Sequence, residues 1–238
     1  EVLVLPTMPP TITQDPAPQS IYRGGTARFA VSATGALQLT YQWYFNDTTL
    51  LTDDTNRTLT IKDVQADKVG SYHVVVSSSA GGTPSAPATL TLLESAAGSY
   101  VDAVVTDRPV ALWRLGEATG PLVHDTMGGF VGFVSNNVTL GLMGALAGDG
   151  DTAAGFDGVS AKVEVPYSSD LSPSTYTVEC WARVDGGQGL FRSPVSSRDD
   201  PPVRGFIFYA PAGDLWEFWS GTNGPAGPWN VISGPAVE

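Results

Sequence analysis

Cysteine is almost absent from this 238-residue sequence, which contains only Cys180, so no disulfide forms within the chain. Long apolar runs are also missing, and the first residues, EVLVLPTMPP, have neither the basic start nor the apolar length of a signal peptide. We therefore expect no membrane insertion. Because the chain begins with Glu, we expect it to be a mature or excised part of a longer protein.

Basic residues are scarce as well. Twelve Lys and Arg stand against 24 Asp and Glu, which gives a formal net charge of −12. An acidic surface repels phosphate backbones and anionic lipid headgroups. The charge balance therefore argues against nucleic acid as a partner and against binding to a membrane surface.

Apolar residues at helical spacing are rare, whereas 27 Gly and 18 Pro punctuate short alternating runs. Such a composition is typical of short strands joined by tight turns, so the predicted fold class is all-β. Between residues 11 and 93 the runs are TARFAVSATG, LTYQWYFND, NRTLTIKDV, ADKVGSYHVVVSSSAGG and APATLTLL. Their spacing is that of a β-sandwich.

Residues 11–93 resemble a bacterial immunoglobulin-like domain. Trp43 matches the core tryptophan of the third strand, and Tyr72 matches the tyrosine whose hydroxyl fixes the corner before the sixth strand. The two cysteine positions of the vertebrate pattern fall on Val31 and Val74. The resemblance thus implies that two valines packed under the Trp43 indole replace the disulfide, each contributing about 1.5–3 kcal/mol.

The segments flanking this domain are predicted to be connections. Residues 1–10 are either a linker or, through Val2 to Leu5, the closing strand of a preceding domain; an extra first strand of the same sandwich is the alternative. Residues 94–98 are predicted to link the sandwich to the rest of the chain.

Residues 99–238 contain the segments ALWRLGE, GDGDTAAGFDG and YTVECWARV. Together these resemble a laminin-G-like, concanavalin A-like lectin/glucanase domain, which implies a two-sheet jelly roll. The segment TYTVECWARV predicts a strand with Cys180 as a buried thiol. The resemblance also implies further strands after WNVISGPAVE, so we expect a domain cut short, with unpaired strand edges.

Catalysis is not expected. Retaining glycoside hydrolysis needs two carboxylates about 5–5.5 Å apart, which on one strand means a spacing of two or four residues. Glu179 is followed at these spacings by Trp181 and Arg183, and Glu217 has no acidic partner in DLWEFWSG. The sequence therefore predicts a protein that is not an enzyme.

Aromatic residues concentrate late in the chain, and rings stack on the apolar faces of sugars. The candidate ligand-binding residues are Trp216, Trp219 and Trp229. Alternation along a strand places Trp216 with Phe218 on one face and Trp219 with Glu217 on the other, so one set must belong to the core. For the set that is not in the core, packing against loops is the alternative to ligand binding.

Calcium is the one cofactor that the sequence suggests, because acidic Gly-rich loops supply the oxygen ligands that Ca²⁺ prefers. The candidate ligands are Glu117, Asp125, Asp149 and Asp151, with Asp157 in the same Gly-rich run. The alternative is that these aspartates cap turns by accepting bonds from nearby backbone amides.

The two resemblances together imply a segment of a larger bacterial protein, located outside the cell or on its surface. We expect it to act in carbohydrate recognition and adhesion, with glycans as partners. One alternative is a structural subunit that joins neighbouring copies through sheet edges into a filament or layer. Another is a set of accessory modules of a glycoside hydrolase.

Overall fold

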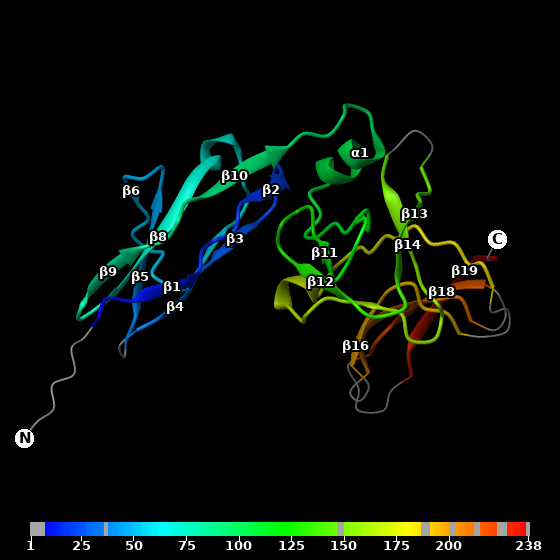
Figure 1. Ribbon diagram of the computed structural model, residues 1–238. Coiled ribbons are helices and arrows are strands. Elements are labelled where there is room, and N and C mark those ends of the chain that lie inside the picture. Colours follow the sequence, from blue (N-terminus) through cyan, green and yellow to red (C-terminus); the bar gives the residue numbers. More distant parts are fainter. Residues whose placement is uncertain are drawn as a thin grey trace, which may run out of the picture. The chain divides into compact units, whose positions relative to one another are not determined.

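The computed structural model confirms the all-β class (Figure 1). Among the residues that the structure describes, the only α-helix is α1 (Tyr100–Thr106), and two single-turn 3-10 helices span Ala66–Lys68 and Ser169–Leu171. In the part of the chain that is described, no helix is long and apolar enough to cross a bilayer. The described residues are 8–35, 38–146, 150–186, 191–199, 203–211, 215–222 and 228–236.

The chain divides into two compact units. The first comprises Glu1–Val134 with Val163–Pro166, and the second comprises Ser135–Lys162 with Tyr167–Glu238. Of the predicted connection at 1–10, residues 1–7 lie outside the described residues. The predicted linker at 94–98 falls inside the first unit, because the chain after it stays in contact with the sandwich.

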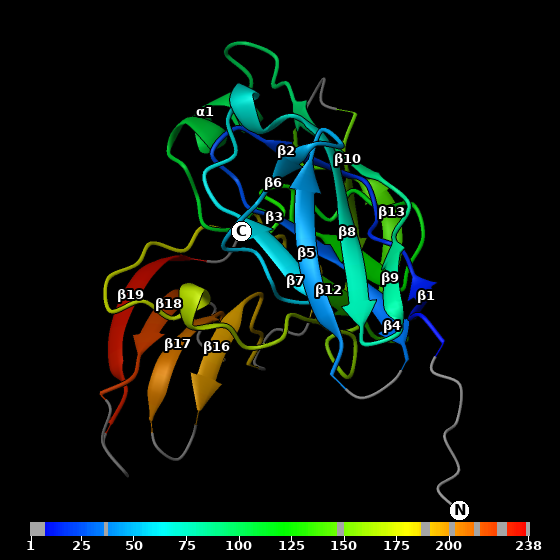
Figure 2. The same cartoon turned by 90° about the vertical axis from the view of Figure 1, so that its left-hand side faces the viewer.

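The larger sheet of the first unit has the order β2–β10–β8–β5–β6, and β9 also pairs with β8 (Figure 2). Its strands are β2 (Gln19–Tyr22), β5 (Thr40–Phe45), β6 (Thr49–Leu50), β8 (Gly70–Ser78), β9 (Gly81–Pro84) and β10 (Ala88–Leu93). Two antiparallel pairs complete the sandwich: β1 (Thr11–Gln14) with β4 (Ser32–Thr34), and β3 (Ala27–Ala30) with β7 (Thr58–Ile61).

One buried cluster joins these sheets. It contains Val31, Trp43, Tyr72 and Val74, and the Trp43 side chain is fully buried. Phe29 from β3 stacks on Tyr72 from β8 with ring centroids 5.0 Å apart. The Tyr72 hydroxyl donates to the Lys68 carbonyl at 2.7 Å, which fixes the turn that leads into β8. Alternation of side chains along the strands therefore produces an apolar core that contains no disulfide.

Residues 99–134 pack onto one end of the sandwich. They contain α1, β11 (Leu122–His124) and β12 (Val131–Val134), and β12 also pairs with β15 (Val163–Glu164). Met127 is buried with Tyr22 and Val101 in a second cluster. Two backbone bonds tie the segment to the sandwich: Tyr22 N–H donates to the Thr126 carbonyl at 3.1 Å, and Thr26 N–H donates to the Met127 carbonyl at 2.6 Å.

The turn at 125–130 lies so close to the sandwich that position 128 requires glycine. Gly128 has φ +82°, and a Cβ there would lie 2.5 Å from both the Thr26 carbonyl oxygen and the Ile21 side chain. Next to it, the Arg28 guanidinium donates to the Gly129 carbonyl at 3.0 Å and lies over the Phe130 ring at 5.6 Å. The sandwich and the turn at 125–130 therefore form one structure.

The second unit holds two smaller sheets. β13 (Thr139–Met143) pairs with β14 (Thr152–Gly155), and the other sheet has the order β16–β17–β18–β19. Its strands are β16 (Ser196–Asp199), β17 (Arg204–Tyr209), β18 (Leu215–Ser220) and β19 (Asn230–Ala236). Buried apolar side chains among the described residues of this unit are Val203, Ile207 and Ala210. These sheets do not by themselves establish a jelly roll, which stays a prediction.

One strand prediction in this unit is wrong. Residues 176–185 form no strand, and Cys180 is exposed instead of buried. Alternation of apolar residues makes a segment fit to pair, but a strand forms only where another strand offers its backbone. Without such pairing the period of two creates no covered face, and the neighbouring Trp181 is 67% exposed.

Candidate functional site

A row of aromatic side chains crosses the four-stranded sheet on one face. The ring centroids of Phe191 and Tyr209 lie 5.3 Å apart, those of Tyr209 and Trp219 5.1 Å apart, and those of Trp219 and Trp229 6.5 Å apart. We call these four residues the aromatic row. The sequence predicted Trp219 and Trp229 as ligand-binding residues. Tyr209 joins them because the register of β17 with β18 pairs it with Glu217, and Phe191 joins through its contact with Tyr209.

Trp216 lies on the opposite face. Along β18 the side chains alternate, and Phe218, two residues after Trp216, contacts Phe206 and Phe208 with centroids 6.1 and 5.2 Å away. Tyr176 also contacts Phe206 on that face, at 5.5 Å. The structure therefore brings two of the three candidate tryptophans together and separates the third from them.

The carboxylate of Glu217 stands beside the aromatic row. Glu217 Oε2 accepts a 2.7 Å hydrogen bond from the indole N–H of Trp219. The residues directly opposite Glu217 on the neighbouring strands are Tyr209 and Ser233. The site thus offers flat apolar rings beside an oriented hydrogen-bond acceptor.

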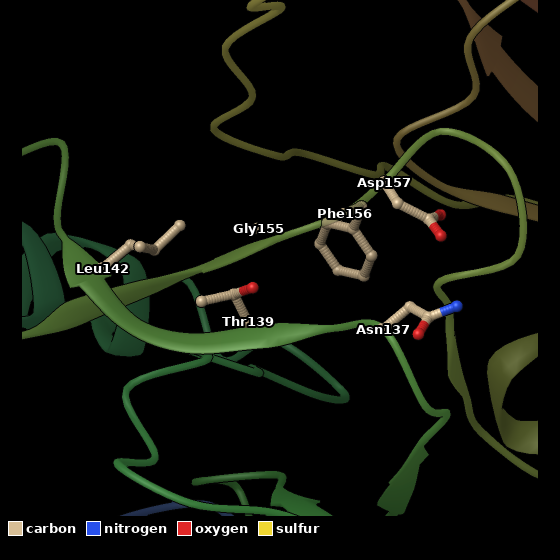
Figure 3. A pocket seen from close by; sticks show the side chains of 6 residues that line it. All are labelled: Asn137, Thr139, Leu142, Gly155, Phe156 and Asp157. Atoms are coloured by element: carbon tan, nitrogen blue, oxygen red, sulfur yellow. The ribbon is translucent and has the colours of Figure 1, made fainter.

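A hollow lies between β13 and the segment that follows β14 (Figure 3). Its volume is about 240 Å³, and its lining residues are Asn137, Thr139, Leu142, Gly155, Phe156 and Asp157. Phe156 is 48% exposed, so an apolar ring lines this hollow as well. The Asn137 side-chain amide donates to the Ser160 hydroxyl at 3.0 Å, and this bond holds the loop at 157–161.

Asp157 builds that loop. Its Oδ1 accepts backbone N–H bonds from Val159, Ser160 and Ala161 at 2.8–2.9 Å. The bond from Ala161 and those from Val159 and Ser160 lower the pKa of the Asp157 carboxyl to about 2. This aspartate therefore caps a turn, which is the role that the sequence offers as the alternative to a calcium site.

The depressed pKa predicts an acid-induced loosening of the loop. Folding favours ionised Asp157, so its contribution is complete above the carboxyl's ordinary pKa of 3.8 and is lost as the pH falls towards about 2. Carbon-detected NMR should give a carboxyl midpoint near 2, with the Val159 and Ala161 amide protons shifting at the same midpoint. In an Asp157→Asn variant those amide shifts should no longer titrate. A carboxyl midpoint near 4 contradicts the prediction.

The second capping aspartate is Asp125, a predicted calcium ligand. Its Oδ1 accepts from the backbone N–H groups of Leu112 and Met127, and its Oδ2 accepts from those of Gly129 and Phe130, all at 2.8–3.1 Å. Burial raises the pKa of this carboxyl, and the four N–H donors oppose the rise. Because both oxygens already accept two bonds each, Asp125 does not fit a calcium site.

The other predicted calcium ligands do not change this conclusion. Glu117 Oε1 accepts from the His124 backbone N–H at 2.8 Å, while its Oε2 is buried without a hydrogen-bond partner. Asp151 belongs to the second unit, and Asp149 lies outside the described residues. Within the described ranges, no three His, Cys, Asp or Glu side chains gather as a metal site. Calcium therefore gains no support from these residues.

Comparison with known proteins identifies one domain. Residues 9–78 match the family model described as immunoglobulin domain, so this part of the chain is an immunoglobulin-like domain. No curated protein matches the chain.

Solved structures that are similar to part of the chain cover about a third of it. The tandem Ig repeats of Dlar are 25% identical over 35% of this chain, with a TM-score of 0.33, and the match spans 48% of that protein. The titin M4 domain is 25% identical over 37% of this chain and 98% of its own length, with a TM-score of 0.34. The N-terminal Ig1-2 module of the Drosophila receptor protein tyrosine phosphatase DLAR is 24% identical over 36% of this chain and 46% of its own, with a TM-score of 0.33.

Proposed function

We propose that the second half of the chain, residues 99–238, binds carbohydrate and that the immunoglobulin-like domain carries it as a spacer. The observation that supports this is the aromatic row beside Glu217. On this proposal the chain is a non-enzymatic adhesion segment of a secreted or surface-located bacterial protein, and residues 99–238 are of the laminin-G-like kind.

The chemistry of the row suits a sugar. Pyranose rings present apolar C–H faces that stack on indole and phenol rings, and Trp219 and Trp229 are half-buried, so each keeps ring surface for a ligand. The Glu217 carboxylate is acceptor-only when ionised, which matches the hydroxyl donors of a sugar. Its bond to the Trp219 indole holds both groups in place before a ligand arrives.

Binding without hydrolysis is favoured by the surroundings of Glu217. A retaining hydrolase needs a second carboxylate about 5–5.5 Å away, and an inverting one needs it about 6.5–9.5 Å away. The positions that flank Glu217 across the sheet carry Tyr209 and Ser233, and those that flank it along β18 on the same face carry Leu215 and Trp219. This face therefore presents Glu217 as a recognition group.

An assembly role is a second candidate. β19 stands at the edge of the four-stranded sheet, and its Val231 and Ile232 are 46% and 69% exposed. An edge strand with exposed apolar residues is a template for pairing with another strand. Association through this edge would make the chain a structural subunit of a filament or layer.

A glycan array followed by titration of tryptophan fluorescence tests carbohydrate binding. Trp219→Ala and Trp229→Ala should each weaken binding by about five- to thirtyfold, because each removes one stacking ring worth roughly 1–2 kcal/mol. Trp181→Ala is the matched control, since it deletes an exposed indole of the same unit outside the sheet and should leave binding unchanged. Wild-type protein that binds no glycan on the array contradicts the proposal.

A further inference from the structure

The six-stranded sheet of the immunoglobulin-like domain carries no strong charge. Strands β2, β5, β6, β8, β9 and β10 are described throughout, and none of their residues is Asp, Glu, Lys or Arg. The nearest charged residues in sequence, such as Asp47, Lys68 and Glu94, stand in the turns that precede or follow these strands. In a chain of net charge −12, a whole uncharged sheet marks one surface as different from the rest.

The outward side of this sheet is organised around two rings. Trp43, Tyr72 and Val74 point into the core, so the alternating Tyr44 and His73 point outward. These two face each other across the ladder and stack with centroids 5.0 Å apart and planes inclined by 8°. Leu50 lies opposite Tyr44 and is 47% exposed.

Hydroxyl groups surround this centre. By the register of the sheet, six further outward positions on β2, β5, β8 and β10 hold serine or threonine; these are Ser20, Thr40, Ser71, Ser77, Thr89 and Thr91. The Ser20 and Thr91 hydroxyls already bond each other across two strands at 2.7 Å. The outward Tyr22 and Leu93, at the ends of β2 and β10, are covered by residues 99–134. We call the rest of the outward surface, with Tyr44 and His73 at its centre, the neutral face.

We propose that the neutral face is a self-association surface that binds the same face of a second copy of this chain. Two copies that each carry a charge of −12 repel each other over most of their surfaces. The repulsion is weakest where the surfaces that meet carry no charge. Aromatic residues at the centre and depletion of charge are also the composition of protein interfaces.

Self-complementarity favours a second copy over another partner. A two-fold axis brings identical patches together, so every group must find its partner on the same patch of the other copy. A hydroxyl both donates and accepts, and stacked rings pack on rings, so this surface meets that condition. A face of carboxylates or of ammonium groups would fail it.

The size of the surface sets the strength of the contact. Five strand positions at about 4.8 Å and strands of about six residues give roughly 500 Å² per copy, below the roughly 800 Å² of a standard interface. The dimer is therefore weak, with a dissociation constant between roughly 10 μM and 1 mM, and forms mainly where copies are crowded or tethered.

Sedimentation equilibrium of the full chain up to about 0.5 mM tests the proposal, and the mass should rise with concentration. Added salt should strengthen association, because it screens the repulsion between the acidic copies and breaks no ion pair. Tyr44→Asp and Leu50→Asp should each weaken association by about tenfold or more, because two-fold symmetry buries the new carboxylate twice in a contact that offers no cation to pair with it. Thr58→Asp is the control and should leave association unchanged, because Thr58 is an exposed residue of β7, which does not belong to the six-stranded sheet.

The two variants also guard against misfolding. If Tyr44→Asp lowers the unfolding midpoint strongly, Leu50→Asp still carries the test, because it changes an exposed residue of a two-residue edge strand. A chain that stays monomeric at all concentrations overturns the proposal. So does association that both face variants leave intact, which would point to the β19 edge. Loss of glycan binding in the face variants without any change in mass would assign the face to a sugar.

Discussion

Replacing Trp43 by alanine is expected to cost about 3–5 kcal/mol of folding free energy, which is most of the stability of a small domain. The indole is fully buried among Val31, Val74 and the other core side chains, so its removal leaves a cavity that the two sheets cannot close. The substitution also deprives the Asn56 carbonyl of the 2.9 Å bond from the indole N–H. The two losses act in the same direction.

Native-state amide exchange of Val74 and Val76 measures this cost within the full chain, because both residues are buried in β8. Their protection should fall by about a hundredfold to several thousandfold. Tyr44→Ala is the matched control: it removes an aromatic side chain from the same strand, but from the outward face, and should cost about 0.5–1.5 kcal/mol. Unchanged protection of β8 in Trp43→Ala would refute the assignment of this core.

The sequence was most informative where a residue's role depends on its own strand. The period of two around Trp43 and Tyr72 places both in the core, and the same period separates Trp216 from Trp219. These outcomes follow from backbone geometry and need no knowledge of the neighbouring strand.

Roles that depend on distant segments could not be predicted in this way. The segment around Cys180 alternates well, yet residues 176–185 form no strand, because pairing is decided by another part of the chain. Likewise, Trp229 meets Trp219 only through the register of β18 with β19. The attachment of residues 99–134 to the sandwich depends on the contact of Met127 with Tyr22, and no local sequence pattern predicts that contact.

Asp125 illustrates the ambiguity of acidic, Gly-rich loops. An aspartate followed by Thr-Met-Gly-Gly suits a calcium site and a capped turn equally well, since both use the carboxylate as an acceptor. Backbone direction decides between them. Here the four amides converge on the carboxylate, and the glycines at 128 and 129 allow the turn to close around it.

Asp125→Ala should therefore release the turn at 125–130 from the sandwich, at a cost of about 3 kcal/mol or more. Each buried N–H that loses its acceptor costs roughly 1–3 kcal/mol, and entry of water recovers part of the sum. The amide of Thr26 reports the effect, because it donates to the Met127 carbonyl of that turn. Its exchange should accelerate about a hundredfold or more, while Val74 in the sandwich core keeps its protection.

Two comparisons separate capping from metal binding. Asp125→Asn keeps the shape and one acceptor oxygen, which still serves two of the four amides, so its cost should fall between wild type and Asp125→Ala. Addition of EDTA to the wild-type chain should leave the exchange of Thr26 unchanged, because the carboxylate is held by N–H groups and not by a cation. Faster exchange of Thr26 in EDTA would instead restore calcium as the partner of Asp125, and with it the sequence's first interpretation of this loop.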